Sequence, residues 1–308
     1  MPPAIDSLRL GTRASPLARL QTQQAIDALA ATGVAGEAVL ITTQGDRDRT
    51  SPLTAIGGQG IFVHELEAAL LDGRIDVAVH SAKDIPSELA DGTALVAFLP
   101  RADVRDVLVS RDGQTLADLP PQAILGCSSR RRIAQMHALR DDLGIRDIRG
   151  NVDTRLAKLA AGDYDAIVLA AAGLARLGRL DVVSEYFSIE RILPPPGQGA
   201  IALQARSRED ATIAALQPIN SQQTEITVRA ERGVLTALGA GCTLPVGALA
   251  RLNAGSLTLI ARVSDEQGER NMTLQLHGDA AEPDLLGQQL GEELLRGGAA
   301  DLLAKTIS

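Results

Sequence analysis

One short pattern occurs twice in this chain and limits the fold more than any other feature. Residues 73–76 and 162–165 each place a glycine three residues before an aspartate. A run of apolar residues follows each aspartate, Val77–Val79 in the first copy and Ala166–Leu169 in the second. Short apolar runs of this kind are typical of strands that are buried on both faces, as in parallel sheets. The repeat therefore predicts two similar α/β lobes built from βαβ units with right-handed crossovers.

A second pair of matching segments supports the two lobes. LGTRAS at 10–15 and LGCSSR at 125–130 each contain a strand end, a glycine, hydroxyl side chains and an arginine near the start of a helix. Ser15 is a suitable N-cap and Pro16 suits the first helical position. A helix N-terminus beside Arg13 and hydroxyl groups is suited to binding an anion. A cap without a ligand would explain Ser15 but not Arg13.

The remaining periodicity predicts further elements of the lobes. Strands are expected near 8–10, 38–42, 75–79, 123–126, 145–148 and 200–205, and helices over 17–29, 62–71, 130–139 and 155–160. The polar, glycine-containing segment 43–60 is long for a connection, so we expect it to be a mobile lid.

From about residue 220 the pattern becomes that of a smaller domain. A helix is expected over 225–238, followed by alternating runs at 246–252, 256–263 and 271–276 and by helices near 282–295 and 298–305. Turn-forming residues join the three runs. The pattern predicts an α+β domain with a three-stranded antiparallel sheet.

Two crossings join the lobes, at Leu99–Asp103 and at the proline-rich Leu193–Gly199. Two crossings predict a hinge beside a cleft. We expect domain 1 at residues 1–99 and 200–218, domain 2 at 100–199 with hinge segments near 99–105 and 193–200, and domain 3 at 219–308.

Composition excludes several classes of protein. The 308 residues carry a net charge of −8, with 2% aromatic residues and no Trp, which argues against a general nucleic-acid binder. There is no run of about 18 apolar residues and no signal-peptide pattern, so neither a membrane span nor export is expected. Two cysteines do not indicate a disulfide framework. A cytoplasmic location is therefore expected.

A basic region stands out within this acidic chain. Residues 126–158 contain eight basic and four acidic side chains, and several of the arginines fall at predicted strand ends or first helical turns. There they oppose the helix dipole unless an anion is present, and arginine binds carboxylate or phosphate through two parallel hydrogen bonds. The region predicts a ligand with several acidic groups, and a phosphate or nucleic-acid strip is the alternative. Arg140 and Arg146 are assigned to a solvated helix face.

Polar side chains follow the first apolar strand. His80, Ser81, Lys83 and Asp84 crowd its carboxyl end, where open α/β sheets bind ligands. On spacing alone, a solvated loop explains these residues as well as a ligand site does. Of the two cysteines, Cys242 lies in a glycine loop after a helix; a lone cysteine is more often a small buried hydrophobe than a nucleophile.

These segments together resemble porphobilinogen deaminase (hydroxymethylbilane synthase) over essentially the whole chain. The matching pieces are GTRASPL at 11–17, GGQGIF at 57–62, VHSAKD at 79–84, SSRRR at 128–132, RGNVDTRL at 149–156, AGLARLG at 172–178, PGQG at 196–199 and Gly241-Cys242. So many matches in the same order are highly specific.

The resemblance implies an enzyme, a transferase of tetrapyrrole (haem) biosynthesis. It implies three domains, the first two similar to type II periplasmic binding proteins. It also implies one dipyrromethane cofactor per chain, joined to Cys242 as a thioether. The enzyme would condense four porphobilinogen molecules head to tail, release ammonia each time, and free hydroxymethylbilane by hydrolysis. It is expected to act as a monomer, without nucleic acid or membrane.

The resemblance also implies roles for individual residues. Asp84 would be catalytic and would accept pyrrole N–H bonds and stabilise positive charge that forms when ammonia leaves. The residues implied to hold the cofactor are Cys242, Lys83, Asp84, Ser129, Arg131, Arg132 and Arg155. Those implied to face the substrate are Arg13, Ser15, Arg149, Arg176 and Gln198. No metal is implied.

Three departures from the family pattern limit this transfer. Some relatives carry lysines where this chain has Ala55 and Gln59, so the segment 43–60 is given no charge role. Cys127 replaces a common threonine as a structural substitution, and Arg130 replaces an apolar residue and is given no role. Two other interpretations stay open on the residues alone: a non-enzymatic anion-binding protein with two lobes, and a nucleic-acid binder that uses the arginines.

Overall fold

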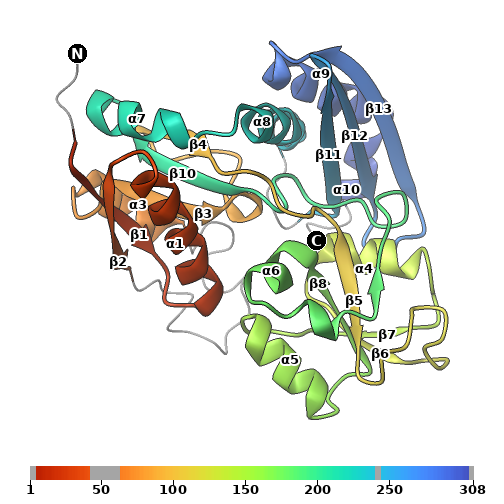
Figure 1. Ribbon diagram of the computed structural model, residues 1–308. Helices are drawn as coiled ribbons and strands as arrows, with labels where there is room; N and C mark the ends of the chain where they lie inside the picture. Colours follow the sequence, from red (N-terminus) through yellow and green to blue (C-terminus); the bar gives the residue numbers. More distant parts are fainter. Residues whose placement is uncertain (1–4, 42–62, 240–243, 305–308) are drawn as a thin grey trace. The chain divides into compact units, whose positions relative to one another are not determined.

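The computed structural model describes residues 5–41, 63–239 and 244–304 (Figure 1). The chain divides into two compact units. Unit 1 comprises Met1–Ala102 and Ala200–Glu225, and unit 2 comprises Asp103–Gly199 and Ile226–Ser308. The predicted lid at 43–60 and the loop with Gly241 and Cys242 lie outside the described residues. Unit 2 holds both the expected domain 2 and most of the expected domain 3, and the division into three domains stays a prediction.

Unit 1 contains a five-stranded mixed sheet in the order β2-β1-β3-β10-β4. Its elements are β1 (Ser7–Thr12), α1 (Pro16–Ala30), β2 (Ala35–Leu40), α3 (His64–Leu71), β3 (Val77–Ser81), a 3-10 turn (Ala82–Asp84), β4 (Thr93–Phe98), β10 (Ile201–Arg206), α7 (Asp210–Leu216) and a second 3-10 turn (Gln217–Ile219). β1 is parallel to β2 and β3, whereas β10 is antiparallel to β3 and β4.

Successive side chains of β3 pack in two different hydrophobic clusters, one on each face of the sheet. Val77 and Val79 pack in the cluster that includes Leu29 of α1. Ala78 packs in the cluster that includes Leu66 and Leu70 of α3. Successive side chains of a strand point to opposite faces, so both faces of this strand are covered by helices.

Unit 2 contains a second five-stranded mixed sheet, in the order β7-β6-β8-β5-β9. The elements of this lobe are β5 (Asp106–Ser110), β6 (Ile124–Gly126), α4 (Arg130–His137), β7 (Gly144–Arg146), α5 (Val152–Ala160), β8 (Ala166–Ala170), α6 (Ala171–Arg176), a 3-10 turn (Leu180–Val182) and β9 (Glu185–Tyr186). β6 is parallel to β7 and β8, and β5 is antiparallel to β8 and β9.

The two sheets share one topology. In each, two successive βαβ units give three parallel strands, and the fourth position is filled by an antiparallel strand that follows a crossing. That strand is β10 in unit 1, which follows the proline-rich crossing, and β5 in unit 2, which follows the crossing at Leu99–Asp103. The prediction of two similar α/β lobes is confirmed.

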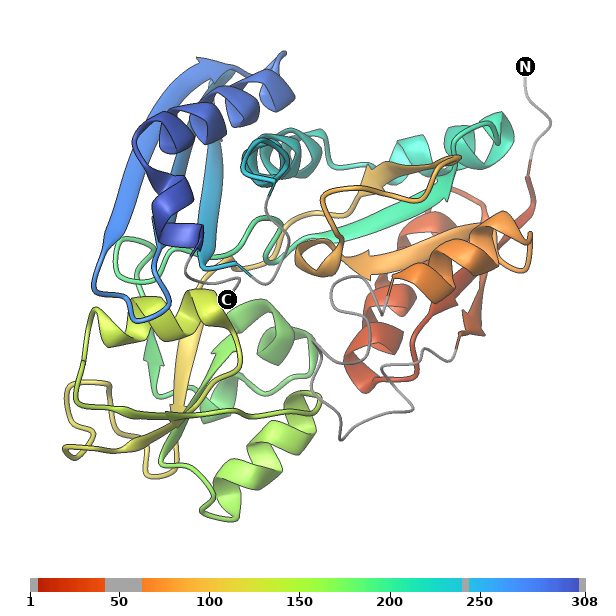
Figure 2. The same ribbon diagram turned by 180° about the vertical axis from the view of Figure 1, so that it is seen from behind.

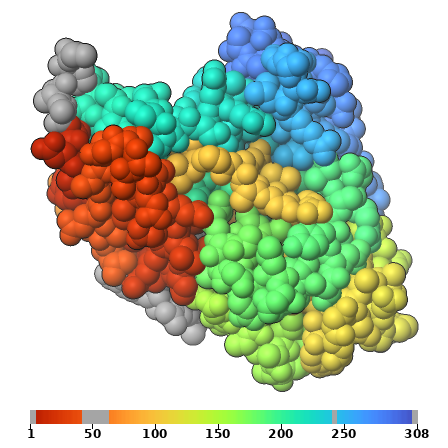
Figure 3. All heavy atoms as spheres, viewed as in Figure 1, coloured from red at the N-terminus to blue at the C-terminus, as the bar shows by residue number. Residues whose placement is uncertain are grey.

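The C-terminal segment of unit 2 forms the predicted antiparallel sheet. Strands β11 (Val246–Asn253), β12 (Ser256–Ser264) and β13 (Asn271–Asp279) pair in sequence order. Helices α8 (Gln222–Ala237), α9 (Pro283–Arg296) and α10 (Ala299–Ala304) contribute to the core on one face of this sheet (Figure 2). In the space-filling view the blue C-terminal atoms lie against green atoms of the same unit (Figure 3). A Cβ on Gly247 of β11 would come within 2.8 Å of the Leu193 carbonyl oxygen.

Some predicted boundaries were wrong. β2 begins three residues before the expected 38, and β7 covers Gly144–Arg146 instead of 145–148. β4, β5, β9, α6 and α7 were not predicted. β5 was missed because it opens on Asp106, a charged residue that is fully buried. Within the described residues, no helix is long and apolar enough to cross a membrane.

Candidate active site

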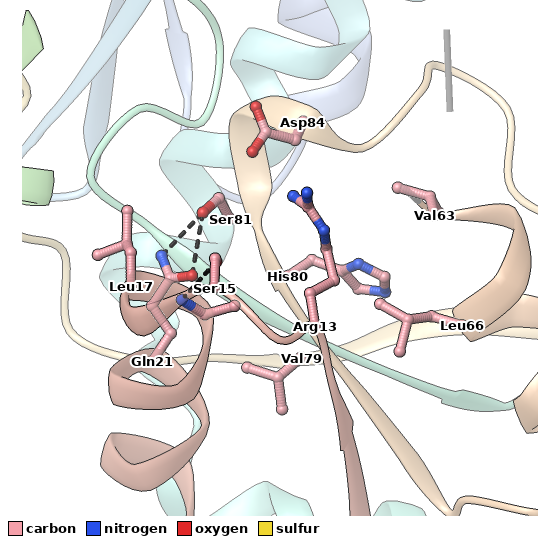
Figure 4. A pocket seen from close by; sticks show the side chains of 11 residues that line it. Arg13, Ser15, Leu17, Gln21, Val63, Leu66, Val79, His80, Ser81 and Asp84 are labelled. Carbon is pink, nitrogen blue, oxygen red and sulfur yellow. Dashed lines mark hydrogen bonds between the residues drawn. The ribbon is translucent and has the colours of Figure 1, made fainter. Parts of the chain in front are cut away.

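A pocket in unit 1 collects several of the predicted site residues (Figure 4). It is lined by Arg13, Ser15, Gln21, His80, Ser81 and Asp84, with apolar walls that include Leu66 and Val79. Arg13 follows β1, and His80 and Ser81 end β3. β1 and β3 are neighbouring parallel strands, so their carboxyl ends meet at the same edge of the sheet.

Local chemistry fixes the start of α1 at this pocket. The Ser15 hydroxyl accepts a hydrogen bond from the Ala18 amide at 3.3 Å, and Pro16 occupies the first turn, as predicted. One turn further on, the Gln21 amide donates to the Ser81 hydroxyl at 2.8 Å, and that hydroxyl lies 3.1 Å from the Gln21 amide oxygen. These bonds tie the first helix to the end of β3.

Asp84 is the exposed carboxylate of the pocket. It ends the 3-10 turn Ala82–Asp84, which the Ile85 amide closes on the Ala82 carbonyl. Within the described residues its carboxylate takes part in no hydrogen bond or ion pair. Lys83 beside it is half-buried. Asp84 is therefore an acceptor available to a ligand.

A second group of predicted residues lies in unit 2 around a carboxylate that sequence reasoning missed. Asp106 is fully buried and accepts hydrogen bonds from Arg131 and Arg132, each at 2.7 Å. The Gln198 amide also donates to Asp106, at 2.9 Å, and to the Val104 carbonyl at 2.8 Å. The sequence signal for Asp106 was its position at the start of an apolar run. A carboxylate buried at such a position needs a cationic or hydrogen-bonding partner, so the run itself indicated a buried pair.

This arrangement changes the picture of the two arginines. Arg131 and Arg132 are buried, with 4% and 7% of their surface exposed. Arg131 also donates to the Leu193 carbonyl at 2.7 Å, and Arg132 to the Val168 carbonyl at 3.1 Å. The sequence predicted an acidic ligand for the basic region. For Arg131 and Arg132, part of that negative charge comes from the Asp106 carboxylate of the protein itself. Within the described residues, Arg131 Nε is buried without a hydrogen-bond partner.

Burial and charge act against each other on Asp106. Burial would raise the pKa of its carboxyl, but the charges of Arg131 and Arg132 and their hydrogen bonds outweigh burial and hold that pKa well below its usual range. Asp106 therefore stays ionised, and it balances one of the two buried cations.

The remaining predicted residues of unit 2 lie at helix ends and crossings. Ser129 caps α4, accepting from the Arg132 amide at 3.5 Å. At α5, Arg155 Nε donates to the Gly150 carbonyl at 2.9 Å, and Arg149 is half-buried one residue before that glycine. Arg176, at the end of α6, donates to the Gly199 carbonyl at 2.8 Å, and burial lowers its pKa.

The basic residues that were assigned to a solvated helix face are placed differently. Arg140 follows the end of α4 and pairs with Asp142 at 2.6 Å. It also donates to the Leu116 carbonyl at 2.9 Å. Arg146 is exposed but ends β7. The helix assignment was wrong for both.

The described cysteine has a structural setting. Cys127 is 3% exposed, and burial raises the pKa of its thiol. A buried thiol with a raised pKa is a poor nucleophile at neutral pH. Cys242 lies outside the described residues.

Comparison with known proteins decides the family. A family model described as porphobilinogen deaminase, dipyromethane cofactor binding domain, matches residues 8–214, and one described as porphobilinogen deaminase, C-terminal domain, matches 225–296. The chain belongs to the porphobilinogen deaminase family. A porphobilinogen deaminase of Roseiflexus castenholzii is 47% identical over 301 residues, which cover 97% of this chain and 99% of the relative. One of Acidothermus cellulolyticus is 47% identical over 304 residues, covering 97% and 92%.

Likeness to solved structures is low. The methionine binding protein MetQ aligns with 71% of this chain and 92% of its own, at 12% identity and a TM-score of 0.45, which supports no statement about the fold. The family, in contrast, confirms the predicted function and enzyme class. Porphobilinogen deaminase is a transferase of tetrapyrrole biosynthesis that uses a dipyrromethane cofactor, and the first family model covers the domain that binds it.

Proposed function

We propose that this member of the porphobilinogen deaminase family condenses four porphobilinogen molecules head to tail in the pocket that holds Asp84, on a dipyrromethane joined to Cys242. The observation that carries the proposal is the exposed Asp84 carboxylate, which lines a pocket with Arg13 and is engaged by no other described residue. We also propose that the protein works as a cytoplasmic monomer without nucleic acid, and its net charge of −8 supports the last point.

The residues present fit a dipyrromethane. This group offers pyrrole N–H donors, for which Asp84 in the pocket of unit 1 is an acceptor, and carboxylates, for which Arg13 in the same pocket is a suitable cation. The buried Nε of Arg131, which has no partner within the described residues, is a donor left over for a carboxylate. When bound, dipyrromethane supplies a nucleophilic pyrrole carbon to which the first substrate is added.

Asp84 is proposed as the catalytic carboxylate. It accepts N–H groups of a pyrrole, and it stabilises the positive charge that the substrate ring acquires when ammonia leaves. Because its oxygens have no competing partner among the described residues, they do not have to give up a bond of the folded protein first.

Arg13 and Ser15 are proposed to hold the acetate and propionate of the incoming substrate. An arginine fork and the first turn of α1 both favour carboxylates, and both line the same pocket as Asp84. Arg149, Arg176 and Gln198 are proposed for the same task in unit 2. The proposed cofactor-holding residues are Lys83, Asp84, Ser129, Arg131, Arg132 and Arg155.

The test of this function is turnover of porphobilinogen by the purified chain and by two variants. Asp84→Asn removes the negative charge and keeps the size of the side chain, so we expect a loss of kcat of about 100-fold or more. Asp91→Asn changes another exposed acid of unit 1 and should leave kcat unchanged. Turnover of Asp84→Asn within a few-fold of the parent, with both variants folded, would reject the role of Asp84.

A mass measurement tests the attachment site separately. We expect Cys242→Ser to lack the covalent cofactor and Cys127→Ser to keep it, because the Cys127 thiol is buried and its pKa is raised. Intact-mass spectra of the parent and both variants give the answer. An adduct on Cys242→Ser and none on Cys127→Ser would overturn the assignment.

A further inference from the structure

His80 is a buried histidine in the wall of the pocket that the mechanism above does not use. Its side chain follows Ala78 on the same face of β3, the face covered by α3, and only 5% of its surface is exposed. Arg13 and Asp84 line the same pocket (Figure 4).

A chain of hydrogen bonds behind His80 fixes which of its ring nitrogens carries the proton. The Gln204 amide nitrogen donates to Glu67 Oε1 at 2.8 Å and to the Thr93 hydroxyl at 2.7 Å. A carboxylate only accepts hydrogen bonds, so the nitrogen of the Gln204 amide must face Glu67 and its oxygen must face His80. His80 Nε2 lies 2.9 Å from that oxygen.

The tautomer follows from these contacts. An amide oxygen only accepts, so His80 Nε2 must carry the hydrogen and donate it. In the neutral ring Nδ1 is then unprotonated and is an acceptor. Glu67 is held in turn by the Ala90 amide, which donates to it at 3.0 Å, so the relay ends on the backbone of the same unit.

The second ring nitrogen is left for a ligand. The Gln204 contact is the one hydrogen bond that His80 makes with its side chain in the described part of the chain. His80 is more than nine-tenths buried and lines the pocket, so Nδ1 is left as a hydrogen-bond acceptor for a ligand held there.

We propose that His80 is a substrate-binding residue whose Nδ1 accepts a hydrogen bond from the ammonium group of porphobilinogen. The inference rests on the proposed function and deepens it. The aminomethyl group of the substrate is an alkylamine, which is protonated at neutral pH like the side chain of lysine. Of the pocket residues, Asp84 offers this cation a charged acceptor and His80 a neutral one.

The chemistry of the leaving group explains why a neutral acceptor is useful. When the C–N bond breaks, its electron pair goes to nitrogen, ammonia leaves with its three hydrogens, and the positive charge passes to the pyrrole ring. A stronger base at this place would take a proton from the ammonium and leave an amine, which is a far poorer leaving group. Burial lowers the pKa of His80 to about 4, so its Nδ1 accepts a hydrogen bond without taking the proton.

Substitutions that replace one ring nitrogen at a time test the idea with the holoenzyme and porphobilinogen. His80→Gln keeps an amide donor near the Nε2 position and lacks the acceptor at Nδ1, and we expect kcat/KM to fall about 10- to 100-fold. His80→Asn keeps an oxygen near Nδ1 and should retain more activity than His80→Gln. His64→Gln changes an exposed histidine 3.6 Å from the same Glu67 and should match the parent.

A nitrogen-15 NMR spectrum of the histidine rings gives a readout that does not depend on turnover. We expect His80, assigned by its loss in His80→Gln, to show a protonated Nε2 and an unprotonated Nδ1. In the slow Asp84→Asn holoenzyme, adding porphobilinogen should shift the Nδ1 signal in the direction of an accepted hydrogen bond. A protonated Nδ1, an unshifted signal, or equal loss of activity in both His80 variants would overturn the inference. A parent enzyme that does not consume porphobilinogen would instead overturn the proposed function.

Discussion

At the scale of single residues, the structure is organised around buried charges that the protein pairs by itself. Asp106 lies between two arginines, and Glu67 accepts a hydrogen bond from Gln204 in the relay behind His80. Both carboxylates are buried and both contact residues far away in sequence. Such pairs depend on the fold being complete, since a buried charge without its partner is strongly unfavourable.

Asp106→Asn tests the first of these pairs. The variant leaves Arg131 and Arg132 buried without a counter-charge, so we expect it to lower the free energy of unfolding by about 3–5 kcal/mol. Asp112→Asn is the matched control, because Asp112 is 65% exposed and lies 3.7 Å from Arg111, an ion pair worth at most about 1 kcal/mol. Urea unfolding followed by circular dichroism measures both. Equal midpoints for the two variants would show that the buried carboxylate does not stabilise the fold.

The sequence predicted one half of the site well and the other half less well. Arg13, Ser15 and Asp84 lie together because they follow neighbouring parallel strands, a relation that periodicity reveals. Arg131 and Arg132 were placed correctly in the first turn of a helix, but their burial against Asp106 was not foreseen. That contact joins α4 to β5, which follows a crossing, and no local pattern reports the partner of a helix face.

At the scale of elements, strands with strict alternation were the most predictable. β12 and β13 were found nearly whole because one face is the more deeply buried and the other carries mostly polar residues. β11 alternates less in burial, because Val246–Ala250 are all buried. β7 was misplaced because three residues of an edge strand carry too short a pattern. β4 has a clear apolar run but was not predicted as a strand, because that run leads directly into the crossing at Leu99–Asp103.

Two helices of unit 2 approach so closely that glycine is required. A Cβ on Gly287 of α9 would overlap the Ala230 carbonyl oxygen of α8 and lie 2.8 Å from the Gly233 Cα. These neighbours are backbone atoms, which cannot turn aside as a flexible side chain can. Overpacking of this kind costs about 1–3 kcal/mol.

Gly287→Ala is therefore expected to destabilise unit 2 by about 1 kcal/mol or more, although alanine is the better helix former by up to about 1 kcal/mol. Gln289→Ala, on the exposed face of the same helix, should be neutral or slightly stabilising. Thermal unfolding of the two variants and the parent separates packing from propensity. A Gly287→Ala variant as stable as Gln289→Ala would mean that the helices can move apart at no cost.

At the scale of the whole molecule, the lobe of unit 1 depends on a strand that arrives from outside its first continuous segment. β10 follows 97 residues of unit 2, Asp103–Gly199, yet it lies between β3 and β4 of unit 1. Its register with both neighbours is antiparallel, with a shift between Leu203 and Gln204 on the β4 side. Gln204, which orients His80, is therefore supplied to unit 1 by the returning segment.

This topology predicts how the chain opens. Removing β10 would leave facing edges of β3 and β4 unpaired, so unit 1 cannot keep its sheet unless the returning strand stays in place. We expect the amide hydrogens of β10 to exchange together with those of β3, at the same free energy of opening across a urea series, and separately from those of β8 in unit 2. Native-state hydrogen exchange measures this directly, with β5 as the internal control, since β5 should exchange together with β8. If the amides of β10 instead exchanged together with those of β8 while those of β3 stayed protected, the prediction would be wrong. Unit 1 would then keep its sheet without the returning strand that carries Gln204.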